Sequence, residues 1–569
     1  MVLTLELIVL ILVNYIGTSS RSLASRAADE ACEMAKEAGF SEFEAMLTTG
    51  GDCRSLIDVQ TGKNKYHIRP QPIDPEHVFR GSCTGNPPTK RGYDAAEKLF
   101  ESAFKGRNGD ETSEALTQVF EDQRNRIASL LNLPEGAEVI LCPSGSDAEY
   151  IPLAIAKALR PDATIANGST QIKEVGAGSA PAAAGRYFST HAPLLGKVDK
   201  EKTYLTGFES IEGITIAARD HTGKVLDAAG EMKKFTEDSL KQGFYPIVHG
   251  VFGGKTGVRD TVMPPSMDAG DTSLGIVDAC QGRFTTDELM EWLDQDSLVL
   301  FTGSKFYQGP PFCGAVIVPP RIAEKLRTAR APTQMFTTDG LGGFMTEKEL
   351  PSCLRKWAPY MMKKDTNNVG LALRWEASLA GMQALAHVSD EERTEAADEW
   401  ASGVVKHVRS EANLDAWCVE RSIVSIRVAK EDGWLSVEEL RDLFRWIGSD
   451  VSEKISGLSP EEKAILSKPA YIGQPVDVSE AFGIVRIALG VDSMLSYMDN
   501  KESTLAGDLH VVKKLATIGK HFKALKQSES VDKEEPMPKQ QNWLVINNSN
   551  ITMSNSLDSL EGIDAGRSL

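Results

Sequence analysis

Short apolar runs alternate with longer helical stretches through the middle of the chain. The stretch at 148–159 has the spacing of a helix and directly follows one such run. Each run is bounded by Gly, Pro or polar residues, as strands usually are. This alternation predicts an α/β domain built around a largely parallel sheet. The expected strands are 137–142, 245–251, 275–278, 297–301 and 314–318.

The pattern changes beyond Pro351. Helical segments at 369–386 and 389–407 precede two alternating runs at 422–428 and 483–489, which predicts a smaller α+β domain. After Ala524 the composition turns to Lys, Glu, Gln, Ser and Asn, which is typical of a disordered tail. The expected organisation is an N-terminal extension (1–80), a large domain (81–350), a small C-terminal domain (351–525) and the tail (526–569).

The first residues form an apolar stretch, 2–16, followed by Ser22-Leu23-Ala24. Glu6 interrupts it, no Lys or Arg precedes it, and it is shorter than the roughly 20 apolar residues that cross a bilayer. A weak leader, a surface-anchoring helix and an extension packed on the body all remain open, and no stable membrane span is expected. Scattered thiols favour the cytoplasm, while the apolar start leaves an organellar or secretory route open.

Length, charge and cysteine content narrow the function. A chain of 569 residues is too long for one core. It carries 62 Lys and Arg against 80 Asp and Glu, a net charge of -18, which opposes binding to nucleic acid. The eight Cys and nine His form no cluster with metal spacing and no C-x-x-C pair, so we expect neither a metal site nor a disulfide framework.

Three clusters carry the candidate chemistry. Ser144, Gly145, Ser146 and Asp147 stand where a strand gives way to a helix, a place that suits an anion but also an ordinary helix cap. Asp278 ends an apolar strand, where open parallel sheets bind ligands, and Gln281 follows it. Lys305 comes directly after the next strand, 305 - 278 = 27 residues later, flanked by Thr302 and Ser304.

In order and spacing these clusters resemble the pyridoxal-phosphate-dependent enzymes of fold type I, and within them the class V aminotransferase and cysteine desulfurase group. The resemblance is clearest from about Gly81 to Pro320 and continues more faintly to Gly490. It implies a large domain with a mainly parallel sheet of the seven-stranded type, a smaller α+β C-terminal domain, pyridoxal 5'-phosphate as cofactor, and a homodimer.

The resemblance also implies a role for each residue. Lys305 would form a Schiff base with the cofactor and shuttle the Cα proton, and Asp278 would keep the pyridine nitrogen protonated. Gln281 would hydrogen-bond the ring hydroxyl. Arg486 would bind a substrate carboxylate. The alternation of apolar and polar residues around it is also that of an ordinary half-buried strand, in which Arg486 would simply point outward. The phosphate would be held by Gly145, Ser146, Thr302 and Ser304, with the contact of Asp147 left open because an acid repels phosphate.

Several features depart from the group. Counting on from the cluster at 144–147 leads to residues 172–175, without the His or aromatic that usually stacks on the ring in this group. His249, Tyr187 and Phe188 are possible substitutes. Cys418 lies beside a strand rather than in a late mobile loop, which argues against a persulfide mechanism. The glycines at 176–178 are expected to form a loop, and those at 253–257 a loop that passes the cofactor.

The sequence therefore favours a pyridoxal-phosphate-dependent aminotransferase acting on an amino acid or related amine. Two alternatives remain. A lyase, either C–S lyase or desulfurase-like or a decarboxylase, would use the same residues and break a different bond to Cα. A non-catalytic descendant would keep the fold for binding or assembly.

Overall fold

A computed structural model of the chain describes residues 38–81, 83–170, 173–198, 204–260, 269–358, 366–479, 482–532, 543–545 and 552–554. Its first sheet has seven strands in the order β2-β10-β9-β8-β7-β3-β6. Only β10 runs antiparallel to its neighbours. The expected α/β fold with a mainly parallel seven-stranded sheet is confirmed. The strands are β2 (Glu138–Cys142), β3 (Ile165–Thr170), β6 (Ile211–Ile216), β7 (Tyr245–Val251), β8 (Leu274–Asp278), β9 (Leu298–Thr302) and β10 (Gly314–Val318).

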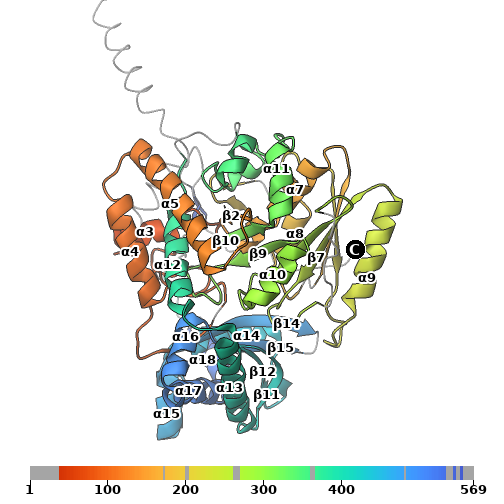
Figure 1. The fold of residues 1–569 in the computed structure, drawn as a ribbon. Coiled ribbons are helices and arrows are strands. Elements are labelled where there is room, and N and C mark those ends of the chain that lie inside the picture. Colours follow the sequence, from red (N-terminus) through yellow and green to blue (C-terminus); the bar gives the residue numbers. More distant parts are fainter. Residues whose placement is uncertain are drawn as a thin grey trace, which may run out of the picture.

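Both faces of this sheet are covered, which explains why most of its strands read as continuous apolar runs. On β9, Leu298 and Leu300 belong to one core cluster, while Val299 and Phe301 belong to the other. In Figure 1, α5 and α12 lie together on one side of the sheet, and α9 covers its far end. The helices of this region are α4 (Lys90–Ala103), α5 (Gly109–Leu130), α6 (Gly145–Ala148), α7 (Tyr150–Leu159), α8 (Ser179–Ala183), α9 (Ala228–Lys241), α10 (Thr286–Asp294), α11 (Pro320–Thr328) and α12 (Val369–Leu385).

Strands β3 and β6 were not predicted from the sequence. All of β3 is buried, yet it carries Asn167, Gly168 and Ser169 in place of an apolar run. A Cβ on Gly168 would stand 2.5 Å from the ring of Phe235, so the close packing of α9 requires a small residue there. Strand β6 is at the edge of the sheet and its middle is exposed, so it lacks a buried pattern.

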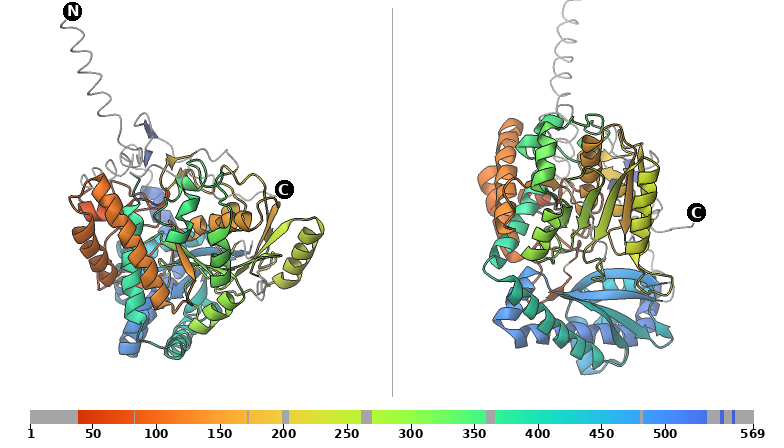
Figure 2. Two further views of the ribbon diagram at one scale, coloured as in Figure 1. Left: turned by 45° about the horizontal axis from the view of Figure 1, so that its top comes forward. Right: turned by 45° about the vertical axis from the view of Figure 1, so that its right-hand side comes forward.

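The second sheet lies beneath the first (right-hand view of Figure 2) and has the order β1-β14-β15-β12-β11, with β13 paired to β12. The runs expected at 422–428 and 483–489 are β12 and β15. Strand β1 comes from far earlier in the chain and pairs with β14 in parallel. The strands are β1 (Val78–Arg80), β11 (Leu414–Glu420), β12 (Ile423–Lys430), β13 (Gly433–Trp434), β14 (Ala470–Ser479) and β15 (Phe482–Ala488).

Helices cover this sheet on the side away from the first sheet (Figure 1). They are α13 (Asp390–Arg409), α14 (Val437–Ile447), α15 (Pro460–Ser467), α16 (Val491–Asp499), α17 (Lys501–Lys520) and α18 (Phe522–Asp532). The remaining elements are α3 (Glu42–Thr48), β4 (His191–Ala192), β5 (Gly196–Lys197), β16 (Trp543–Val545), β17 (Thr552–Ser554) and three 3-10 turns at 341–343, 352–357 and 452–454.

The two ends of the chain are covered only in part. The apolar start at 2–16 lies outside the described residues, as does most of the segment expected to form a tail. Helix α18 continues into that segment and ends at Asp532. None of the helices in the described ranges combines the length and the apolar character needed to cross a membrane.

Candidate active site

A cavity opens where parallel strands of the first sheet end. Strands β7, β8 and β9 end at Val251, Asp278 and Thr302, and all three residues line it. The turns after β2 and β3 add further lining. Carboxyl ends of adjacent parallel strands are where open α/β sheets bind ligands. The topology of the sheet alone therefore brings these distant segments together.

Most of the residues singled out in the sequence border this one cavity. Asp147 is buried beside the cavity without lining it, and Arg486 also stands outside the lining. The predicted residues in the lining are Gly145, Ser146, Asp278, Gln281, Thr302, Ser304 and Lys305.

The turn after β2 forms a narrow cup. Ser144 caps α6: its Oγ accepts the backbone N–H of Asp147 at 3.2 Å and donates to Asp147 Oδ2 at 2.6 Å. A Cβ on Gly145 would stand 2.9 Å from Thr302 Cγ2 and 3.0 Å from Cys280 Sγ. Glycine is needed here because the cup packs directly on the ends of β8 and β9. The acid of Asp147 turns back to its own cap, away from the mouth of the cup.

Asp278 and Gln281 are held by their neighbours. Asp278, 5% exposed, accepts the backbone N–H of Cys280 on Oδ1 at 2.9 Å. Gln281 Oε1 accepts from Arg283 Nη1 at 2.9 Å. This contact occupies the amide oxygen of Gln281 and leaves the NH₂ as the group that can donate to a ligand.

Lys305 follows β9 in a turn that is fastened from several sides. Asn86 Nδ2 donates to the carbonyl oxygens of Ser304 at 2.8 Å and Lys305 at 3.1 Å. Thr302 Oγ1 donates to the Cys280 carbonyl oxygen at 2.8 Å, so its hydroxyl hydrogen ties the end of β9 to the segment after β8. The backbone that carries Lys305 is thus held independently of any ligand.

Arg54 is a cavity residue that the sequence analysis missed. Its guanidinium pairs with Asp52 through Nε–Oδ1 (2.9 Å) and Nη2–Oδ2 (2.6 Å), and it stands 4.9 Å from the ring centroid of Phe312, another lining residue. Both Arg54 and Asp52 belong to the segment expected to be an N-terminal extension. The neighbouring glycines Gly50 and Gly51 indicate a turn in the sequence, but they do not indicate where the Arg54 guanidinium lies.

Arg486 lies on β15 and uses its guanidinium within the protein. It donates to the carbonyl oxygens of Gln474, at 3.3 and 3.1 Å, and Lys255, at 3.2 Å. Lys255 belongs to the loop in which Gly253 and Gly254 line the cavity. Arg486 therefore joins the second sheet to a cavity loop.

The segment after β3 forms the cavity wall at the place where the resemblance implies a stacking ring. Glu174 and Val175 line it, and Glu174 is paired with Arg219 at 2.9 Å. Gly176 and Ser179 line it as well, so the glycine-containing loop at 176–178 is part of the wall. The cavity lining includes none of the three possible stacking substitutes, His249, Tyr187 and Phe188. Cys418 on β11 also lies outside the lining. Ile172 falls outside the described residues.

Comparison with known proteins finds similarity only among solved structures. No family model matches the chain, and no curated protein matches it. Similar structures include tryptophan decarboxylase of Catharanthus roseus in complex with L-tryptophan, at 15% identity, covering 81% of this chain and 85% of that chain with a TM-score of 0.47. The cysteine desulfurase CsdA of Escherichia coli has 14% identity, covers 80% and 96%, and has a TM-score of 0.45. Mouse CSAD has 14% identity, covers 78% and 84%, and has a TM-score of 0.45. Likeness at this level assigns neither a substrate nor a reaction.

Proposed function

We propose that this protein is a pyridoxal-phosphate-dependent enzyme of fold type I that acts on an amino acid or a related primary amine. The observation that carries the proposal is that one cavity is lined at once by an amine (Lys305), a buried carboxylate (Asp278) and a hydroxyl-bearing cup (Ser146). These groups match the aldehyde, the ring nitrogen and the phosphate of the cofactor. The cavity also leaves space beside them: a Cβ on Gly253 would meet nothing closer than Gln281 Cγ at 4.0 Å.

Each residue has a separate task in this proposal. When bound, the cofactor supplies an electron-withdrawing ring that takes up the electron pair released as a bond to the substrate Cα breaks. Asp278 keeps a proton on the ring nitrogen, and Gln281 donates its amide hydrogen to the ring oxygen. Ser146 and Ser304 donate hydroxyls to the phosphate, beside the backbone of Gly145. The amine of Lys305 would hold the aldehyde carbon until a substrate amine takes its place, and would then move a proton to or from Cα.

Transamination is the reaction we propose first, because it needs a proton carrier and a carboxylate anchor and no further catalytic group. Two arginines are candidates for the anchor. Arg54 lines the cavity, whereas Arg486 donates to backbone carbonyls outside the lining, so Arg54 is the better placed of the two. A decarboxylase or a C–S lyase would use the same residues, and the homodimer implied by the resemblance belongs to the same proposal.

The cofactor is tested by trapping it. The purified protein incubated with pyridoxal phosphate is expected to gain a visible absorption band, and borohydride should leave a pyridoxyl mass on the peptide that contains Lys305. Lys305→Ala should abolish the adduct. Lys157→Ala, which removes a lysine on α7 outside the lining, should keep it. A colourless wild-type protein, or an adduct on another lysine, contradicts the assignment and favours the non-catalytic reading.

The reaction is tested on the coloured protein with a panel of amino acids. We expect a keto acid together with the amine form of the cofactor. Release of carbon dioxide would establish a decarboxylase, and release of ammonia or sulfide would establish an eliminating lyase. A protein that binds the cofactor and converts none of the amines would point to the binding descendant.

A further inference from the structure

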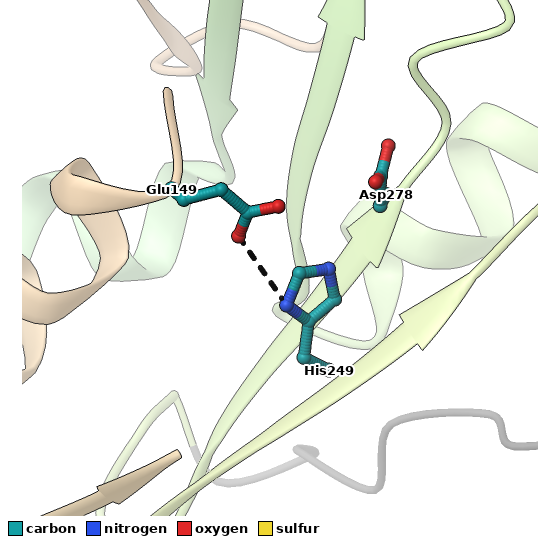
Figure 3. A group of neighbouring side chains, drawn as sticks. All are labelled: Glu149, His249 and Asp278. Carbon is teal, nitrogen blue, oxygen red and sulfur yellow. Dashed lines mark ion pairs between the residues drawn. The ribbon is translucent and has the colours of Figure 1, made fainter. Parts of the chain in front are cut away.

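Two buried side chains stand next to Asp278 without lining the cavity (Figure 3). Glu149 comes from the junction of α6 and α7, and His249 lies on β7, the strand beside β8. One oxygen or nitrogen atom from each of the three side chains lies within 4.8 Å of those of the other two. Glu149, His249 and Asp278 are 1%, 2% and 5% exposed. Three titratable groups thus share one dry site.

The polar atoms of this site are poorly satisfied by the rest of the protein. Glu149 Oε2 lies 3.4 Å from His249 Nδ1. Among the described residues, neither this oxygen nor either ring nitrogen of His249 has a hydrogen-bond partner of good geometry. Buried polar groups normally have one, and apolar side chains in their place would stabilise a core at least as well. Stability alone therefore does not account for these two residues.

The charges of the site can be placed from its surroundings. Burial, together with the charge of Asp278, raises the pKa of Glu149 well above its usual value, so this carboxyl keeps its proton. Burial lowers the pKa of His249, against the opposing effect of Asp278 and Asp260, so the imidazole is neutral. A neutral imidazole carries one N–H and one acceptor nitrogen. The pair therefore adds no charge of its own beside Asp278.

The order of the three residues decides which atom donates. In Figure 3, the Nδ1 of His249 faces Glu149 and the other ring nitrogen, Nε2, is turned to the side where Asp278 lies. The protonated Glu149 can donate to Nδ1, which leaves the ring hydrogen on Nε2. That hydrogen then points toward the Asp278 carboxylate, whose Oδ1 already accepts from Cys280.

We propose that Glu149 and His249 are positioning residues that act through Asp278, with Glu149 donating to His249 Nδ1 and His249 Nε2–H donating to the Asp278 carboxylate. This inference rests on the proposed function, in which Asp278 faces the ring nitrogen of the cofactor. The relay turns the carboxylate toward the cavity and adds no second charge beside it. It makes ring binding depend on two residues that never touch the cofactor.

The test separates cofactor affinity from stability. Glu149→Leu and His249→Leu are expected to weaken pyridoxal phosphate binding roughly tenfold, the effect of one hydrogen bond to a charged group. The thermal midpoint of the cofactor-free variants should stay the same or rise, because buried polar atoms are removed. Glu149→Gln keeps a neutral donor and should restore wild-type binding.

A matched control is Glu349→Leu. Glu349 is another fully buried acid, but its Oε2 accepts from the backbone of Thr346 at 2.9 Å. Its replacement should lower the thermal midpoint and leave cofactor affinity unchanged, the opposite of what we expect at Glu149.

Four results would overturn the inference. Lower midpoints with unchanged affinity in the Glu149 and His249 variants would make the pair purely structural. A stoichiometric metal ion in the purified protein, lost in His249→Leu, would make the three residues a metal site. Failure of the wild type to bind the cofactor would remove the proposed function as well, whereas normal wild-type binding with unaffected variants would remove this inference alone.

Discussion

Asp147 shows how an acid next to the proposed phosphate cup can be kept from repelling an anion there. Its side chain is buried and bonded to Ser144 Oγ, while its Oδ1 has no partner among the described residues. Burial raises its pKa from 3.8 to about 7, an effect that Asp52 increases and that Ser144 and Arg54 oppose. The acid is therefore substantially protonated near neutral pH, and its charge at the cup is reduced.

The raised pKa predicts a pH-dependent cost at Asp147. The folded protein holds this proton up to about pH 7, whereas the unfolded chain loses it near 3.8, so stability falls as the pH rises between these values. Asp147→Asn should remove this loss. Its unfolding free energy in urea should match that of the wild type near pH 4 and exceed it by up to roughly 4 kcal/mol at pH 8. If the unfolding free energies of the two proteins change equally with pH, the raised pKa of Asp147 is contradicted.

At the scale of elements, α12 presses directly on the turn that carries Lys305. A Cβ on Gly303 would stand 2.5 Å from Ser378 on α12, and a Cβ on Gly309 would stand 1.9 Å from Ser378 Oγ. The two glycines allow the helix and the turn to touch, because neither brings a side chain into the contact. The position of the lysine backbone is thus set in part by a helix from a later segment of the chain.

Gly303→Ala is expected to cost about 1–3 kcal/mol of unfolding free energy, as other overpacked cores do. It should also slow formation of the lysine–cofactor adduct. Ser378→Gly removes the atoms that the new methyl group would meet, so the double variant should regain much of the loss. Unfolding free energies of the four proteins in this cycle measure the coupling. Additive effects would show that the contact is absent.

At the scale of the whole molecule, the segment before α4 connects the cavity with the second sheet. Arg54 lines the cavity, and β1 joins β14 some way further along the same segment. At the end of β1, Arg80 Nε pairs with Asp508 Oδ1 of α17 at 2.5 Å, and Trp400 Nε1 of α13 donates to Asp508 Oδ2 at 2.9 Å. The early segment therefore contributes both to the cavity wall and to the second sheet.

This buried ion pair predicts a large asymmetry between single and double variants. Arg80→Met should destabilise the protein by about 3–5 kcal/mol, because it leaves Asp508 charged and buried. Arg80→Met combined with Asp508→Leu should recover most of that loss, since no unpaired charge remains. Denaturant unfolding of the three proteins gives the comparison. A double variant less stable than Arg80→Met would contradict this expectation. It would indicate that the Trp400–Asp508 hydrogen bond contributes more to stability than the Arg80–Asp508 ion pair does.

Several elements could be predicted because their signal in the sequence is local. Strands β7 and β10 agree residue for residue with the apolar runs that predicted them, and α12 and α13 differ from their predicted ranges by a residue or two. These elements could be predicted because apolar runs and helical spacing act between neighbours in the chain. The same holds for the cup, Asp278 and Lys305, which are marked by the strands that precede them.

Tertiary structure alone decided which side chains meet. Strand β3 lacks an apolar run, and its glycine at 168 is required by the packing of Phe235. Arg54 reaches the cavity from a turn that lies outside any helix or strand. Glu149 and His249 meet beside Asp278 because adjacent parallel strands and the helix after the cup bring together residues a hundred positions apart. Contacts of this kind depend on sheet order and helix packing, and neither leaves a pattern within a short window of sequence.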